Sequence, residues 1–120
     1  MKRNFNLIVL AFFLMGCAGI DKNADPVVVN AERVASMSAD TVDAFLHWEY
    51  NNRNIAPKEV RDVATDLRIY APHAIISLRT LTKAYKANRT PENKASLITA
   101  QAVVSELANE AQKWLALNAK

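Results

Sequence analysis

The sequence predicts an all-α protein, an antiparallel up-down-up three-helix bundle, and three observations support this fold class. Both glycines, Gly16 and Gly19, lie near the N-terminus, so the rest of the chain has none with which to build tight hairpins. Pro26, Pro57 and Pro91 stand where proline commonly opens a helix. Between these prolines, apolar residues recur at alternating spacings of three and four, the pattern of amphipathic helices.

A secretory signal is predicted ahead of the first helix. Lys2 and Arg3 precede an uncharged apolar run from Leu7 to Met15. A basic start followed by a short apolar run and small residues is typical of an export signal. The run is too short to cross a bilayer, because a spanning helix needs ~20 apolar residues.

The apolar run ends in Leu14-Met15-Gly16-Cys17-Ala18, which resembles the bacterial lipobox. The resemblance implies transfer of a diacylglyceryl group to Cys17, cleavage between Gly16 and Cys17, and acylation of the new amino terminus. The alternative is an ordinary cleaved signal with a chance cysteine. Cys17 is the only cysteine of the chain, so an internal disulfide is excluded.

This resemblance divides the chain into a signal peptide (1–16), a lipidated N-terminus and tether (17–24), and the bundle (25–120). Two or more acyl chains hold a protein stably to a membrane, whereas one does so only marginally. In Gram-negative lipoproteins an aspartate after the cysteine resembles an inner-membrane retention signal. This chain has Ala18 there. The expected location is therefore the outer membrane, facing the periplasm.

Composition limits what the exported chain is. Removal of residues 1–16 from the 120-residue sequence leaves 104, enough for one domain. Without Lys2 and Arg3 the chain has 13 basic and 12 acidic side chains, so its net charge is +1. A nearly neutral exported chain gives no reason to expect a nucleic-acid partner.

Three helices are predicted, over about Pro26–Asn51, Pro57–Ala87 and Pro91–Leu117. The short connections between them make successive helices antiparallel neighbours. Pro72 falls inside the second helix, where proline removes a backbone hydrogen bond and clashes with the preceding turn. The helix is therefore expected to bend or divide near Tyr70. The apolar stripe of the second helix is predicted to contain Val60, Val63, Leu67, Tyr70, Ala74, Leu78, Leu81 and Tyr85.

A basic ridge on the second helix is the main candidate for an interaction surface. From Arg68 to Arg89 the chain has five bases and no acid. The ridge is predicted on the side opposite the apolar stripe, where it would meet anionic lipid, cell wall or an acidic partner. The alternative is a solvated face without a ligand. Its residues are Arg61, Arg68, Arg79, Lys83 and Lys86.

The end of the first helix carries a second group of polar residues. Glu49 falls on the apolar stripe, and Arg53 stands one turn later. This spacing indicates either a helix-end ion pair or a buried functional carboxylate. Trp48, Tyr50 and the polar run 51–54 are either a recognition tip or a solvated loop beside a core tryptophan.

No catalytic or metal-binding pattern is found. His47 and His73 are the only histidines, and they do not share a helix turn with each other or with Cys17. No His-x-x-x-His or paired-carboxylate spacing accompanies them. No hydroxyl has a base and an orienting group that the sequence identifies. A non-enzymatic protein without a cofactor is therefore expected.

The leading hypothesis is a small lipid-anchored cell-envelope protein that presents a helical bundle for interaction or support. An alternative is a phage-type envelope lipoprotein, since outer spanin subunits and superinfection-exclusion lipoproteins are similar in size and signal. A third is a peptidoglycan-associated lipoprotein, because the murein lipoprotein is also helical and ends in lysine, as Lys120 does here. The partner and the oligomeric state are not indicated.

Overall fold

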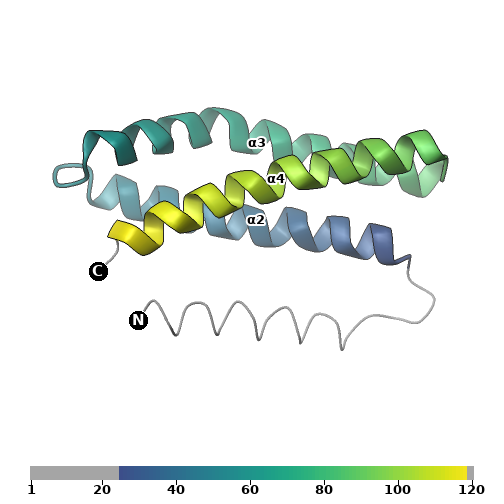
Figure 1. Cartoon of the computed structure of the whole chain (residues 1–120), viewed down its shortest axis with the longest axis horizontal. Coiled ribbons are helices and arrows are strands. Elements are labelled where there is room, and N and C mark those ends of the chain that lie inside the picture. Colours follow the sequence, from purple (N-terminus) through teal and green to yellow (C-terminus); the bar gives the residue numbers. More distant parts are fainter. Residues whose placement is uncertain (1–24, 119–120) are drawn as a thin grey trace.

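The computed structural model describes residues 25–118, which form three long helices. They are α2 (Pro26–Asn51), α3 (Lys58–Ala87) and α4 (Pro91–Asn118). Successive helices run antiparallel, and each packs against both others (Figure 1). The predicted all-α three-helix bundle is confirmed. The predictions for residues 1–24, including Cys17, and for Lys120 lie outside the described residues.

Two of the helices begin at side-chain caps directly before a proline that the sequence predicts to open a helix. The Asp25 carboxylate accepts a hydrogen bond from the Val27 amide at 3.0 Å, with Pro26 at the first helical position. At the start of α4, the Thr90 hydroxyl accepts one from the Asn93 amide at 3.1 Å. Each cap satisfies a backbone donor that the first helical turn leaves without an intrahelical acceptor.

The start of α3 differs by one residue from the prediction. Pro57 is the N-cap of α3 and not its first helical residue, because its ψ of 153° is extended. Its carbonyl nevertheless accepts from the Val60 and Arg61 amides, both at 3.1 Å. The α2–α3 loop is closed by Asn52, whose carbonyl accepts from the amides of Ile55 and Ala56.

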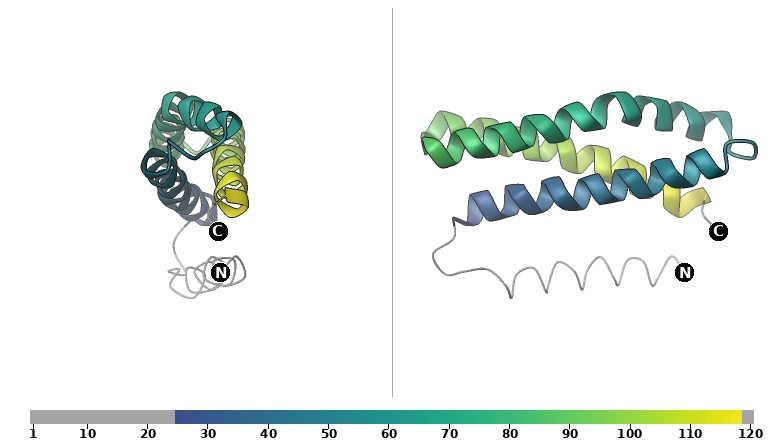
Figure 2. Two further views of the ribbon diagram at one scale, coloured as in Figure 1. Left: turned by 90° about the vertical axis from the view of Figure 1, so that its left-hand side faces the viewer. Right: turned by 180° about the vertical axis from the view of Figure 1, so that it is seen from behind.

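The core consists of two clusters, one toward each end of the bundle. We call the end where α2 begins, α3 ends and α4 begins the N-terminal end, and the opposite end, which holds the α2–α3 loop, the loop end (Figure 2). Alanine is prominent in both clusters, and its small side chain allows helices to approach closely. The cluster toward the N-terminal end comprises Val28, Ala31, Ala35, Ile75, Leu78, Tyr85, Leu97 and Val104. The other comprises Val42, Phe45, Ala56, Val60, Ala64, Leu67, Ala71 and Ala111.

The buried face of α3 is rotated from the predicted stripe. Tyr70, predicted to be in the core, is 60% exposed, and Ala71 is buried beside it. Thr82 is also buried. Its hydroxyl donates to the Leu78 carbonyl at 2.7 Å, so the buried polar group has a hydrogen-bond partner. The buried residues are Val60, Ala64, Leu67, Ala71, Ile75, Leu78, Thr82 and Tyr85.

Pro72 does not divide α3. The helix is continuous from Lys58 to Ala87, and Figure 1 shows a single ribbon that bows along its length. Pro72 is exposed, so the missing amide hydrogen bond lies on the solvent side. A helix that bows over the core with its interior proline outward is the expected accommodation.

The N-cap of α4 gives a test of this architecture. We expect Thr90→Ala to lower the free energy of unfolding by about 1 kcal/mol, because the Asn93 amide loses its acceptor. Urea unfolding followed by circular dichroism measures the change. The control is Thr80→Ala, which removes an exposed hydroxyl from the interior of α3. Equal destabilisation by both substitutions would contradict the capping role.

Candidate functional site

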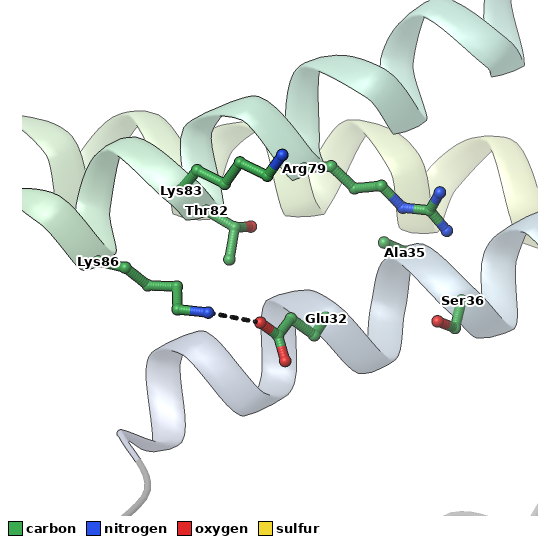
Figure 3. A pocket seen from close by; sticks show the side chains of 7 residues that line it. All are labelled: Glu32, Ala35, Ser36, Arg79, Thr82, Lys83 and Lys86. Carbon is green, nitrogen blue, oxygen red and sulfur yellow. Dashed lines mark hydrogen bonds and ion pairs between the residues drawn. The ribbon is translucent and has the colours of Figure 1, made fainter.

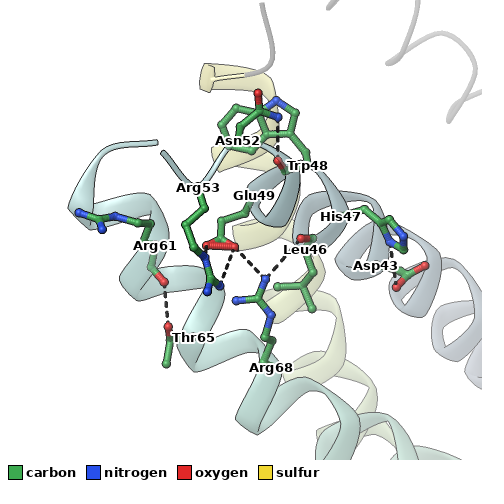
Figure 4. Close-up of polar contacts among 10 residues, drawn as sticks. All are labelled: Asp43, Leu46, His47, Trp48, Glu49, Asn52, Arg53, Arg61, Thr65 and Arg68. Atoms are coloured by element: carbon green, nitrogen blue, oxygen red, sulfur yellow. Dashed lines mark hydrogen bonds and ion pairs between the residues drawn. The ribbon is translucent and has the colours of Figure 1, made fainter. Parts of the chain in front are cut away.

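A buried carboxylate at the loop end is the most distinctive polar group of the described residues. The Glu49 side chain is 0% exposed. Arg68 Nη2, from α3, donates to Glu49 Oε2 at 2.7 Å, and Arg53 Nε, from the loop, donates to Oε1 at 3.2 Å (Figure 4). Arg68 Nη2 also lies 3.4 Å from the Leu46 carbonyl oxygen. One guanidinium group therefore joins α3 both to a side chain and to the backbone of α2.

The electrostatics of this site favour the ionised carboxylate. Burial alone raises the pKa of Glu49, but the hydrogen bonds from Arg68 and Arg53 and their positive charges together outweigh it. The pKa therefore lies below its ordinary value of 4.5. A general acid or base working near neutral pH needs the opposite shift. The arrangement suits a structural ion pair.

The helix-end pair of Glu49 and Arg53 was predicted, whereas the stronger partner, Arg68, was not. The i, i+4 spacing identifies Arg53 on the same helix end. Arg68 lies 19 residues away along the chain, and only the packing of α3 on α2 brings it there. The predicted helix-end ion pair is present, and Glu49 is also fully buried, while a functional role for its carboxylate stays a prediction.

The predicted tip is partly core and partly exposed. Trp48 packs against the core cluster at the loop end, and Asn52 Nδ2 donates to its carbonyl at 2.8 Å. Tyr50 and Ile55 are 69% and 79% exposed. The Arg53 guanidinium lies over the Tyr50 ring, with its Cζ 5.8 Å from the centroid. The loop end therefore exposes two large apolar side chains beside a guanidinium group.

The sequence predicted that the basic ridge lies on the side of α3 opposite the core. The structure places it elsewhere. At ~100° per residue, its residues lie roughly a quarter turn from the buried line of α3, on the flank that faces α2. The prediction was wrong because it included Val63, Tyr70 and Leu81 in the apolar stripe. These three residues lie on the side of the buried line away from α2, so the predicted centre of the stripe was too far from the ridge. Arg68 is consequently engaged with Glu49, while Arg61 points away from it (Figure 4).

The other three ridge residues line a groove of about 410 Å³ between α2 and α3 (Figure 3). Lys86 Nζ pairs with Glu32 Oε1 at 3.3 Å, and both side chains are more than half exposed. Among the described residues, no carboxylate pairs with Arg79 or Lys83. The groove therefore has an excess of positive charge. Its lining residues are Glu32, Ala35, Ser36, Arg79, Thr82, Lys83 and Lys86.

The N-terminal end is fastened by a second ion pair. Arg89 Nε donates to Asp25 Oδ2 at 2.9 Å, and Arg89 Nη1 donates to the Lys86 carbonyl at 2.9 Å. The hydrogen bond from Arg89 is the main cause of a lowered Asp25 pKa. The same arginine therefore joins the N-cap of α2 to the last turn of α3.

Charge is separated along the axis of the bundle. Divided at the helix midpoints, the half toward the N-terminal end comprises residues 25–38 and 73–104, with six basic and three acidic side chains, a net charge of +3. The half toward the loop end comprises residues 39–72 and 105–118, with five basic and eight acidic side chains, a net charge of −3. The near-zero net charge of the described residues conceals this separation.

A second groove, between α3 and α4, has the opposite character. It encloses about 310 Å³, and exposed Tyr70 and Val103 contribute apolar surface to it. Its acidic residues are Asp66, Glu106 and Glu110, and all three belong to the half toward the loop end. The two grooves flank α3 and differ in both charge and height along the axis.

Neither histidine belongs to a group of metal ligands within residues 25–118. His47 Nδ1 lies 3.7 Å from an Asp43 carboxylate oxygen on the surface of α2, and His73 is exposed on α3. Within residues 25–118, no three histidine, cysteine or acidic side chains are grouped so as to hold a metal ion. None of the helices in that range combines the length and apolarity that a membrane span requires.

Comparison of the chain with protein-family models, with curated proteins and with solved structures gives no match.

Loss of Arg68 is expected to destabilise the bundle more than loss of Arg53. Breaking a buried ion pair from one side costs ~3–5 kcal/mol, and because Arg68 is 33% exposed we expect about 2–3 kcal/mol for Arg68→Met. The Arg53 side chain is 52% exposed, so Arg53→Met should cost below ~1 kcal/mol. Glu49→Leu combined with Arg68→Met should recover much of the loss. Urea unfolding of the wild type, Arg53→Met, Arg68→Met and the double variant measures these costs. An equal loss of stability on replacing either arginine would refute the expected order.

Stability is expected to fall in acid because of the lowered carboxylate pKa values. The ordinary values are 4.5 for Glu49 and 3.8 for Asp25, and both folded values lie below these. The unfolded chain therefore binds more protons in acid than the folded chain does. The stabilisation is complete above pH 4.5 and is lost as the pH falls through the pKa values of the folded state. Glu49→Gln should flatten the acid dependence of the unfolding free energy, whereas Glu106→Gln, on the exposed surface of α4, should retain it. A wild-type slope in Glu49→Gln would show that another group is responsible.

Proposed function

We propose that this chain is a non-enzymatic, lipid-anchored protein of the bacterial cell envelope, held to the outer membrane through Cys17. The observation that carries the proposal is the Leu14-Met15-Gly16-Cys17 motif directly after an apolar run. The bundle is the part of the protein that the anchor presents to the periplasm.

The position of the bundle in the chain supports this proposal. Residues 17–24 reach at most ~28 Å when fully extended, so the N-terminal end of the bundle stays close to the membrane. That end has the net positive charge, which suits the anionic surface of a membrane. The α2 helix has 26 residues, so the loop end lies ~39 Å from that end along the axis of the bundle.

The polar groups of the bundle support a non-enzymatic role. The Glu49 carboxylate accepts hydrogen bonds from two arginines and has a lowered pKa, so it is poorly suited to proton transfer at neutral pH. The grooves of the described residues lie at the surface between pairs of helices. Surface grooves of this kind favour binding of a partner over a reaction on a substrate that is enclosed away from water.

The loop end is the surface that we propose meets a protein partner. Exposed Tyr50 and Ile55 lie there, with Arg53 over the tyrosine ring. Aromatic residues and arginine are the residues that most often dominate binding energy at protein interfaces. Its distance from the anchored end would let it reach a partner in the periplasm.

Lipid attachment is tested by growing producing cells with labelled palmitate. We expect the label in the wild-type chain and none in Cys17→Ser, because the acyl groups are joined to Cys17 and to its amino group. Globomycin, which inhibits the lipoprotein signal peptidase, should leave a longer chain that retains residues 1–16. Ser36→Cys, which adds a thiol elsewhere, is the matched control and should leave labelling unchanged. A wild-type chain without label would contradict the proposal.

A further inference from the structure

The groove between α2 and α3 contains cationic groups that the fold leaves without strong partners. Arg79 and Lys83 are exposed and have no carboxylate partner among the described residues, whereas Arg68 and Arg89 are each held in an ion pair. Lys86 has one partner, Glu32, in an exposed pair at 3.3 Å. Exposed pairs of this kind are weak, so an incoming anion competes readily with Glu32.

The shape of the groove suits a small, highly charged group. Figure 3 shows Arg79 and Lys86 extending from α3 toward α2, with Ser36 on the facing surface. The volume of about 410 Å³ accommodates a phosphate group and the glycerol attached to it. Guanidinium and ammonium groups are the usual protein donors to phosphate oxygens.

The groove lies in the positive half of the bundle, toward the end at which the chain enters α2. Resting on the proposed anchoring at Cys17, we propose that this groove binds the phosphate head group of an anionic lipid in the membrane that holds the anchor. Arg79, Lys83 and Lys86 supply the charge, and Ser36 lines the groove on α2. Binding would turn the α2–α3 face toward the membrane surface.

A second copy of the chain is a poorer occupant of this groove. The acidic residues that would complement it, Asp66, Glu106 and Glu110, lie in the half toward the loop end. Two copies anchored in one membrane stand in the same direction, so the basic groove of one is level with the positive half of the other. Like charges would then face each other, which disfavours that pairing.

The test uses the acylated full-length protein reconstituted in two kinds of vesicle. One kind is phosphatidylcholine alone, and the other contains phosphatidylglycerol in addition. Because Cys17 is the only cysteine and is acylated, Ser36→Cys introduces a single reactive thiol. A neutral maleimide then modifies that thiol, and the rate of modification is measured on each kind of vesicle. The ratio of the two rates is the quantity compared between variants. Asn51→Cys, at the loop end, is the control position.

We expect modification at position 36 to be several-fold slower on the anionic vesicles, and modification at position 51 to be equal on both. Adding Arg79→Glu and Lys83→Glu should abolish the difference at position 36. The matched pair, Lys58→Glu and Arg61→Glu, makes the same change of charge on the same helix toward the loop end and should retain it. Equal rates on the two vesicles, or equal effects of the two pairs, would overturn the inference.

A further arm separates the lipid from a soluble anion. Inorganic phosphate is added to the protein on neutral vesicles, and protection of position 36 there would overturn the assignment to a lipid head group. Flotation of the vesicles distinguishes failure of this inference from failure of the proposed function. A chain without acyl groups that does not float contradicts both, whereas a chain that floats without protecting position 36 contradicts this inference alone.

Discussion

The ion pair between buried Glu49 and Arg68 fixes the alignment of α2 and α3 together with the apolar side chains packed around it. The buried line of α3 alternates small and large side chains, as in Ala64, Leu67, Ala71 and Ile75. Sliding α3 by one turn, ~5.4 Å, would bring large side chains to the places of the alanines. It would also remove Arg68 from a carboxylate that is 0% exposed, and an unpaired buried charge is strongly unfavourable. The polar pair therefore reinforces the alignment that the apolar side chains specify, and the pair of Asp25 and Arg89 does the same at the other end.

The helices were predictable from sequence because their boundaries are local. Asp25 and Thr90 cap the turns that follow them, and proline stops or starts a helix by its own geometry. The buried face of α3 was less predictable, since it depends on what packs against it. Tyr70 has more apolar surface than Ala71, yet the alanine is buried and the tyrosine is exposed. The partner of Glu49 on α3 was not predictable, because no local rule relates two residues that only tertiary packing brings together.

The charge pattern acquires its meaning only in the folded chain. Along the sequence, bases without acids run from Arg68 to Arg89 after a segment rich in acids. Antiparallel packing brings the later part of that basic segment beside the first half of α2, where Glu32 is the one carboxylate that pairs with the groove's lysines among the described residues. The acids nearer the end of α2, such as Asp40 and Asp43, lie in the other half of the bundle. The separation of acidic and basic residues along the sequence thereby becomes a separation of charge along the axis of the bundle. The acidic residues of α2 neutralise the basic ridge only in part.

Under the proposed anchoring, this axial separation has a consequence for orientation. Attachment at one point does not by itself fix the direction in which the bundle tilts. The potential of an anionic membrane decays over a Debye length, ~8 Å at physiological ionic strength, so it acts on the half near the anchor and hardly on the far half. The near half has a net charge of +3 and is attracted, while the half with −3 stands beyond the reach of the repulsion. Tilting the whole bundle onto the membrane would bring the acidic side chains of the loop end into the same field, so the charge distribution favours a partial tilt in which the α2–α3 groove faces the membrane and the loop end stays raised from it.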